Sequence, residues 1–152
     1  MSILWSLRLR REAASVPFVR RLLVDAMETA GVDSDVSHDL AVAVSEACAN
    51  AVAHGGSATR AGASGAYRVT AYLDDRTCRI EVEDSGPGFP AGPPRALGHR
   101  PSSYPAEQGR GLGLIRQLAD HVHIGNRPGR AGAVVSFDKS LKWRDDTPHA
   151  AV

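Results

Sequence analysis

The sequence predicts an α/β (α+β) two-layer sandwich, in which helices cover one face of a mixed, mostly antiparallel sheet. Three observations lead to this class. Apolar residues alternate at period two in several short segments, and they recur at helical spacing in longer ones. The strand-like segments also follow one another in pairs, as in hairpins. A doubly wound parallel sheet is therefore not expected, because it needs strands and helices in alternation.

The first half of the chain predicts one strand and two helices. Residues 3–9 form a half-buried strand whose inward side is formed by Ile3, Trp5, Leu7 and Leu9. Helical spacing predicts a helix over 15–30, which Gly31 ends, and a second helix over 34–54. The Gly-rich and Ser-rich composition of 55–65 indicates a loop.

The second half predicts four strands and a short helix around a long irregular stretch. The strands are 67–73, 78–84, "HVHIG" and "GAVVSFDK", and the first two form a hairpin through the turn residues "DD". Residues 85–110 hold six of the nine prolines and show no periodicity. A stretch of this length inside a compact domain is typical of a functional lid. A helix over 111–120 follows it.

Composition limits the classes of protein that the chain can belong to. The 152 residues, 43% of them hydrophobic, suffice for one domain, which we expect over 1–143 with a disordered tail at 144–152. The formal net charge of +1 gives no field that would attract nucleic acid or an anionic membrane. No apolar run is long enough for a membrane span. Cys48 and Cys78 are expected to be buried, reduced thiols in a cytoplasmic protein.

Polar side chains form a stripe along the second predicted helix. Asp39, Glu46, Asn50 and His54 fall within one narrow sector, opposite the apolar residues of the same helix. A solvated face is the ordinary explanation of such a stripe. However, the stripe contains no Lys or Arg and no ion pair one turn apart, and small residues flank it. These features favour a surface against which a ligand lies.

Glu46 and Asn50 lie one helical turn apart, so their side-chain oxygens can converge on one object. The neutral amide oxygen of Asn50 suits Mg²⁺, which takes most of its ligands from water and substrate phosphates. The carboxylate of Glu46 can orient or deprotonate a hydroxyl group or water. This pair is typical of phosphoryl transfer, although on its own it is a weak signal.

Asp84 stands at the end of an alternating strand and is followed by Gly86 and Gly88. The ordinary explanation is a turn that closes a strand. The functional explanation is a carboxylate that accepts a hydrogen bond from an exocyclic amine. The two glycines would then let a flat base approach the backbone closely.

Three further glycines, Gly109, Gly111 and Gly113, lie just before and inside the start of the predicted helix over 111–120. Free backbone N–H groups and the helix dipole make such a start suitable for binding an anion. The spacing is neither the dinucleotide fingerprint nor a Walker loop, because no strand precedes it and no GK[ST] is present.

Together these motifs resemble the GHKL ATPase superfamily of gyrase, MutL and histidine kinases. Glu46 to Asn50 is similar to its N box, "DSGPG" (84–88) to its first glycine box, and "GRGLGL" (109–114) to its second. The length and the stretch "SEACANAVAHG" are most similar to the anti-sigma-factor serine/threonine kinases. The resemblance covers about residues 3–140 and implies a Bergerat fold with ATP between the helices and a lid at about 85–110.

The resemblance also implies roles for individual residues. It implies Glu46 as catalytic base, Asn50 as the Mg²⁺ ligand and Asp84 as the acceptor of the adenine amine. The other implied ATP-binding residues belong to the two glycine boxes: Gly86, Gly88, Gly109, Arg110, Gly111, Leu112 and Gly113. The lid residues Arg95 and Arg100 are further candidates for phosphate contacts, whereas His54 has no assigned chemistry.

The chain departs from the family pattern in two places. The last strand usually begins "GT", and here Gly132 and Ala133 stand there, so a hydroxyl contact to adenine is missing. Losing one hydrogen bond costs about 0.5–1.5 kcal/mol, which predicts weaker nucleotide binding. The expected lid also contains Pro93 and Pro94, so its closure is expected to differ from that of the family.

The resemblance implies a cytoplasmic, homodimeric protein kinase that uses Mg-ATP to phosphorylate a small antagonist (anti-anti-sigma) protein and that also sequesters a sigma factor. Direct nucleic-acid and membrane contacts are not expected. The main alternative is a non-catalytic, ATP-dependent binding switch. Two others are the catalytic half of a split histidine kinase and a small α/β domain without a ligand.

Overall fold

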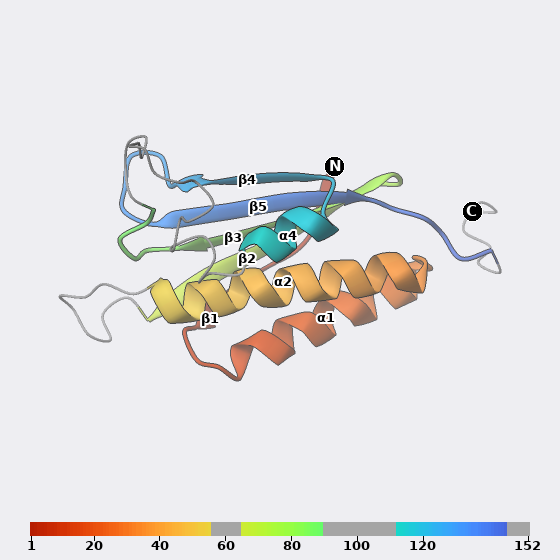
Figure 1. The fold of residues 1–152 in the computed structure, drawn as a ribbon. Coiled ribbons are helices and arrows are strands. Elements are labelled where there is room, and N and C mark those ends of the chain that lie inside the picture. Colours follow the sequence, from red (N-terminus) through yellow and green to blue (C-terminus); the bar gives the residue numbers. More distant parts are fainter. Residues whose placement is uncertain (56–64, 90–111, 146–152) are drawn as a thin grey trace.

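The computed structural model describes residues 1–55, 65–89 and 112–145. These residues form two layers, with the helices on one face of a five-stranded sheet (Figure 1). In chain order the elements are β1 (Ser2–Arg10), α1 (Ser15–Ala30), α2 (Ser34–His54), β2 (Ala66–Leu73), β3 (Thr77–Asp84), α4 (Leu112–Leu118), β4 (His121–Asn126) and β5 (Ala133–Ser140). The predicted two-layer sandwich is therefore confirmed, and each predicted element is present.

The sheet has the strand order β1-β2-β3-β5-β4. Each of the four pairings between the described strands is antiparallel, so the parallel pairs that a mixed sheet would contain do not occur there. Two hairpins, β2-β3 and β4-β5, lie side by side because β5 pairs with β3. The ends of β3, β4 and β5 meet through this arrangement, with Asp84, Asn126 and Ala133 at one end of the sheet.

Strand β1 differs from the predicted alternation at its start. The register shifts between Ile3, which lies opposite Tyr72, and Trp5, which lies opposite Ala71. This irregularity inserts one residue, so Ile3 no longer shares the face of Trp5. The Ile3 side chain is 60% exposed as a result, although period two had predicted it on the inward side.

The two long helices begin and end differently. Helix α1 ends at Gly31, whose φ of 90° is the left-handed conformation in which glycine is favoured. Helix α2 begins at Asp33, whose carboxylate accepts a 3.0 Å hydrogen bond from the N–H of Asp35. In the described residues, no helix is long and apolar enough to cross a membrane.

The hydrophobic core lies between α2 and the sheet and includes the fully buried side chains of Leu40, Val44, Ile80 and Phe137. Cys48 and Cys78 are both buried and free, as predicted. Burial raises the pKa of each thiol to about 12, so both are un-ionised at neutral pH and inert.

Candidate functional site

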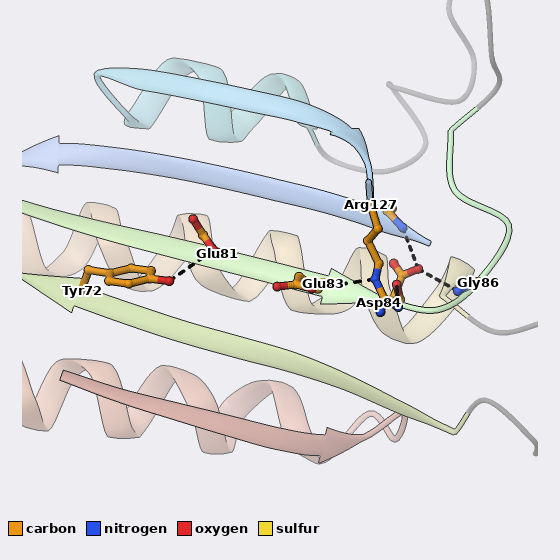
Figure 2. A network of polar contacts seen from close by, with 7 residues as sticks. Tyr72, Glu81, Glu83, Asp84, Gly86 and Arg127 are labelled. Carbon is orange, nitrogen blue, oxygen red and sulfur yellow. Dashed lines mark hydrogen bonds and ion pairs between the residues drawn. The ribbon is translucent and has the colours of Figure 1, made fainter. Parts of the chain in front are cut away.

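The Asp84 carboxylate is buried at the end of β3, where its residue is only 6% exposed. Its Oδ1 accepts two backbone hydrogen bonds, from Gly86 N–H at 2.9 Å and from Ala133 N–H at 3.2 Å (Figure 2). Arg127 donates from Nη1 to the main-chain oxygen of Asp84 at 3.1 Å. These contacts tie β3 to the start of β5 and to the turn that follows Asp84.

The second carboxylate oxygen of Asp84 has no donor among the described residues. A buried carboxylate is costly unless its oxygens accept hydrogen bonds. One oxygen of Asp84 therefore serves the fold, whereas Oδ2 is available to a donor from a ligand. An amine or amide N–H group has the chemistry that this oxygen requires.

Three glycines surround Asp84 because backbone segments touch there. A Cβ atom added to Gly86 would lie 2.6 Å from the carbonyl carbon of Gly55, and one added to Gly55 would lie 2.8 Å from Asp84 Cβ. Gly132 has a φ of 131°, and a Cβ there would collide with the main-chain oxygen of Asp84. The end of α2, the end of β3 and the start of β5 therefore approach one another as closely as only glycine allows.

Gly88 and Asn126 together fix the chain after Asp84. The Asn126 side chain accepts from Phe89 N–H at 2.7 Å and donates to the Phe89 main-chain oxygen at 3.2 Å. Gly88 has a φ of 82°, and a Cβ added to it would lie 2.5 Å from Asn126 Oδ1. A side chain at Gly86 would therefore collide with Gly55, and one at Gly88 would collide with Asn126. Both glycines lie in the turn that follows Asp84.

Asn50 carries an unpaired buried oxygen. The residue is 4% exposed, and its Oδ1 is buried without any hydrogen-bond partner. Such an orphaned amide oxygen suits a cation, which is the chemistry expected of an Mg²⁺ ligand. The described residues hold no cluster of three His, Cys, Asp or Glu side chains that would bind a metal. A cation at Asn50 would therefore need further ligands from a substrate, as phosphates provide.

The other members of the polar stripe lie in different environments. Glu46 is half-buried one turn before Asn50, on the same helix. Asp39 forms a 3.4 Å ion pair with Lys139 of β5, so its role is to join α2 to the sheet. His54 lies exposed at the last residue of α2. Asp39 at the start of the stripe therefore has a structural role, whereas Glu46 and Asn50 at its centre belong to the candidate site.

Arg11 holds the end of the helix that carries Asn50. Its Nη2 donates to Val52 O at 2.6 Å and its Nε to Ala51 O at 3.2 Å. Its own N–H donates to Gly65 O at 2.8 Å. A guanidinium on the last carbonyls of a helix is favoured by the helix dipole. The last turn of α2 is therefore fastened to the end of β1, close in sequence to Asn50.

The second glycine box is described only in part. Leu112 begins α4 with a side chain that is 1% exposed and packed in the core, so any contact to a ligand would come from its backbone. Gly113 is exposed, and a Cβ there would meet nothing within 4 Å. The predicted residues Gly109, Arg110 and Gly111 lie outside the described residues, as do Arg95, Arg100 and most of the expected lid.

Sequence reasoning missed four contributors to this end of the molecule: Arg11, Gly55, Asn126 and Gly132 as a close-contact glycine. Gly55 had a visible signal, because it directly follows the predicted helix and ends "SEACANAVAHG". Gly132 had a weaker one as the first residue of a predicted strand. Arg11 and Asn126 had none, because their partners are main-chain atoms 40 and 37 residues away.

The comparisons with known proteins agree with this architecture. A family model described as the histidine kinase-like ATPase domain matches residues 9–139. The structure of the RsbU and RsbW domains of Rv1364c from Mycobacterium tuberculosis aligns with a TM-score of 0.63 and 23% identity, over 94% of this chain and 35% of that one. The catalytic domain of histidine kinase ThkA aligns with a TM-score of 0.47 and 14% identity, over 93% and 100% of the two chains. A search of curated proteins found no match.

The chain therefore belongs to the histidine kinase-like ATPase domain family, because the model of that family matches most of its length. This confirms the GHKL-type resemblance that the motifs predicted. Family membership indicates ATP as the ligand class. The chain spans about a third of the Rv1364c structure, 35% of that chain, and at 23% identity the likeness establishes the fold.

Proposed function

We propose that this protein binds Mg-ATP and acts as a serine/threonine protein kinase of the anti-sigma type. It transfers the γ-phosphate to a small antagonist protein and also binds a sigma factor. We further propose that it works in the cytoplasm as a homodimer. The single observation that supports the nucleotide site best is the division of the buried Asp84 carboxylate, with Oδ1 bound by the backbone and Oδ2 available.

In this proposal Asp84 Oδ2 accepts the hydrogen bond from the exocyclic amine of adenine. Gly86 and Gly88 let the backbone after Asp84 pack against Gly55 and Asn126, and this packing fixes the turn beside the carboxylate to which adenine is proposed to bind. Ala133 contributes its N–H to Asp84 but has no hydroxyl, so adenine loses the contact that threonine gives in the family.

Asn50 and Glu46 face the phosphates in the same proposal. Mg²⁺ held by Asn50 Oδ1 would neutralise phosphate charge, which is the main requirement of phosphoryl transfer. Glu46, one turn earlier, would orient the acceptor hydroxyl and take its proton. Gly109, Arg110, Gly111, Gly113 and the backbone of Leu112 are proposed to bind the phosphate oxygens.

The partner proposal has two supports. One is the likeness of "SEACANAVAHG" to the anti-sigma kinases. The other is the alignment with the structure of the RsbU and RsbW domains of Rv1364c. An acceptor Ser or Thr on a small antagonist protein is the substrate class that follows from this support.

Calorimetry tests the nucleotide site. Wild-type protein and Glu46→Gln should both bind Mg-ATP, whereas Asp84→Asn should lose binding, because the amide would present a second donor to the adenine amine. Asp39→Asn is the matched control, since Asp39 lies on α2, the helix of Glu46, but its carboxylate pairs with Lys139. Wild-type protein that fails to bind Mg-ATP would overturn the proposal.

A radiolabel transfer assay with candidate antagonist proteins separates the kinase from an ATP-dependent binding switch. The kinase proposal requires labelled Ser or Thr on one antagonist, and a loss of at least about 100-fold in rate for Glu46→Gln, which is typical for loss of a general base. Transfer at the wild-type rate by Glu46→Gln would show that Glu46 is not the base. Mg-ATP binding and partner binding without transfer would favour the switch.

A further inference from the structure

A second pocket lies at the same end of the sheet but on the face turned away from the helices. It has a volume of about 230 Å³, and its charged lining residues are Arg8, Arg68, Glu83, Asp84 and Arg127. In Figure 2 Glu83 and Arg127 lie in front of the strands while the helices lie behind them. Asp84 belongs to the first glycine box, but no motif accounts for the three arginines of this pocket.

The pocket contains an unfavourable arrangement of charge. Arg8 of β1 and Arg68 of β2 lie directly opposite each other in the antiparallel register, so their side chains share one face as neighbours. Like charges in this position destabilise a sheet. In the described part of the chain Arg8 has no hydrogen bond or ion pair, and Arg68 contacts only the neutral hydroxyl of Ser6 at 3.2 Å. Arg68 also lies directly opposite Glu83 of β3, which favours a positive charge at that position, whereas the fold does not explain why Arg8 is arginine.

A third guanidinium completes the lining from the opposite side. Arg127 follows β4 and is only 16% exposed at its side chain. It is held by its hydrogen bond to the main-chain oxygen of Asp84 and by a 3.8 Å ion pair with Glu83. Glu83 is the next residue in the cross-strand row after Arg68. The lining therefore holds three guanidinium groups and two carboxylates, Glu83 and Asp84, and Oδ1 of Asp84 already accepts two backbone hydrogen bonds.

We propose that this pocket binds a phosphate monoester or inorganic phosphate through Arg8, Arg68 and Arg127. Arginine is the residue that pairs with tetrahedral oxyanions through two parallel hydrogen bonds. A dianion would relieve the repulsion between Arg8 and Arg68. The volume of about 230 Å³ admits the anion together with the first atoms of the group that carries it. This site adjoins the proposed nucleotide site, because Asp84 also lines the pocket, but its three arginines are not among the residues proposed to bind ATP.

Nitrogen-15 NMR at constant ionic strength tests the proposal through the arginine Nε–H signals. Inorganic phosphate and O-phospho-L-serine are the two probes, with L-serine as the neutral control, and Mg²⁺ with a non-hydrolysable ATP analogue is present throughout. Both probes should shift the signals of Arg8, Arg68 and Arg127 along saturable curves. Tighter binding of O-phospho-L-serine would identify a phosphorylated side chain as the source, and equal binding would identify free phosphate.

Substitutions make the test specific. Arg8→Gln should weaken phosphate binding about 10-fold or more, the usual effect of losing a hydrogen bond to a charged group. Arg68→Lys, which keeps the charge but loses the planar fork, should weaken it by less. Arg79→Gln is the matched control, because Arg79 is exposed on the same face of β3, farther from Asp84. Shifts that do not saturate, or that change equally in Arg79→Gln and Arg8→Gln, would overturn the proposal.

Discussion

The two ends of the sheet use the same residue type in different ways. At one end Asp74 closes the β2-β3 hairpin, where its Oδ1 accepts from Arg76 N–H and Thr77 N–H, each at 2.8 Å. Asp120, also at that end, accepts from Ser140 N–H at 2.6 Å. At the other end Asp84 likewise accepts two backbone hydrogen bonds on one oxygen. Hydrogen bonding to the backbone therefore does not distinguish a turn from a site.

Burial distinguishes them. Asp74 and Asp120 reach solvent, and backbone hydrogen bonds lower the pKa of both carboxyls. Asp84 is 6% exposed and has an oxygen that no described donor reaches. Water solvates the second oxygen of a turn aspartate, whereas Oδ2 of Asp84, in a largely buried residue, is placed to accept a hydrogen bond from a ligand. The comparison indicates that burial of the residue together with an unpaired carboxylate oxygen distinguishes Asp84 from the turn aspartates.

The largest expected difference between the two ends is in nucleotide affinity. Asp84→Asn should weaken Mg-ATP binding about 10- to 100-fold, because a hydrogen bond to a charged group contributes about 1.5–3 kcal/mol. Asp74→Asn should leave the affinity unchanged. Calorimetry on both variants measures this, with circular dichroism to check folding. Equal affinities for the two variants would remove the distinction between the ends.

The next effect concerns stability at the Asp84 end. Gly132→Ala should lower the free energy of unfolding by about 1–3 kcal/mol, because Gly132 combines a φ of 131° with contact to the Asp84 main-chain oxygen. Gly129→Ala is the matched control, since Gly129 has a φ of 71° but nothing within 4 Å of the added Cβ. Urea denaturation gives the free energy of unfolding of both variants, and the difference between them is the cost of the contact beyond that of the backbone strain. If the two lose the same stability, the close packing around Asp84 is unimportant.

Arg11 tests how the Asp84 end is held together. Arg11→Gln should destabilise the protein by about 1–2 kcal/mol, because two hydrogen bonds to the last carbonyls of α2 are lost or weakened. Arg10→Gln should cost less than about 0.5 kcal/mol, since within the described residues the Arg10 side chain makes only an exposed 3.8 Å ion pair with Glu12. Hydrogen exchange should show reduced protection of the backbone amides in the last turn of α2. Loss of protection elsewhere instead would contradict this role.

The smallest effect concerns the far end and acid pH. The folded pKa of Asp120 is lowered, so its contribution is present above the ordinary pKa of about 3.9 and is lost as the pH falls through the folded value. Wild type should therefore exceed Asp120→Asn in stability by about 0.2–1 kcal/mol at pH 6, because the group is solvent-screened. The gap should close near pH 2. A gap that widens in acid would reverse the sign of this linkage.

Much of this fold could be predicted from periodicity. Each strand and helix was expected within a few residues, because alternating and helical spacings are local signals. The exposed position of Ile3 could not be predicted, since the irregularity between Ile3 and Trp5 shows only in the pairing with β2. The cross-strand pair of Arg8 and Arg68 was missed for the same reason, because register is set between segments 60 residues apart.

In the candidate site, too, local motifs could be predicted and contacts between distant segments could not. Asp84, Asn50 and the glycines after Asp84 were expected because motifs place them close together in sequence. Their roles remain predictions, whereas their burial and contacts are properties of the fold. The stripe was predicted as one surface, but Asp39 belongs to an ion pair with Lys139. Helical spacing gives the direction of a side chain and not what lies opposite it.

The divided carboxylate of Asp84 has a consequence for how the protein can evolve. Only asparagine could replace this residue and keep an oxygen acceptor for the backbone contacts of Oδ1, and it would put a donor in place of Oδ2. A change of base preference would therefore be more accessible at Ala133. Its N–H holds Asp84 whatever its side chain is, and because the residue is only 3% exposed, small side chains are the ones that fit there. Selection can act on the neighbour while the aspartate stays constant.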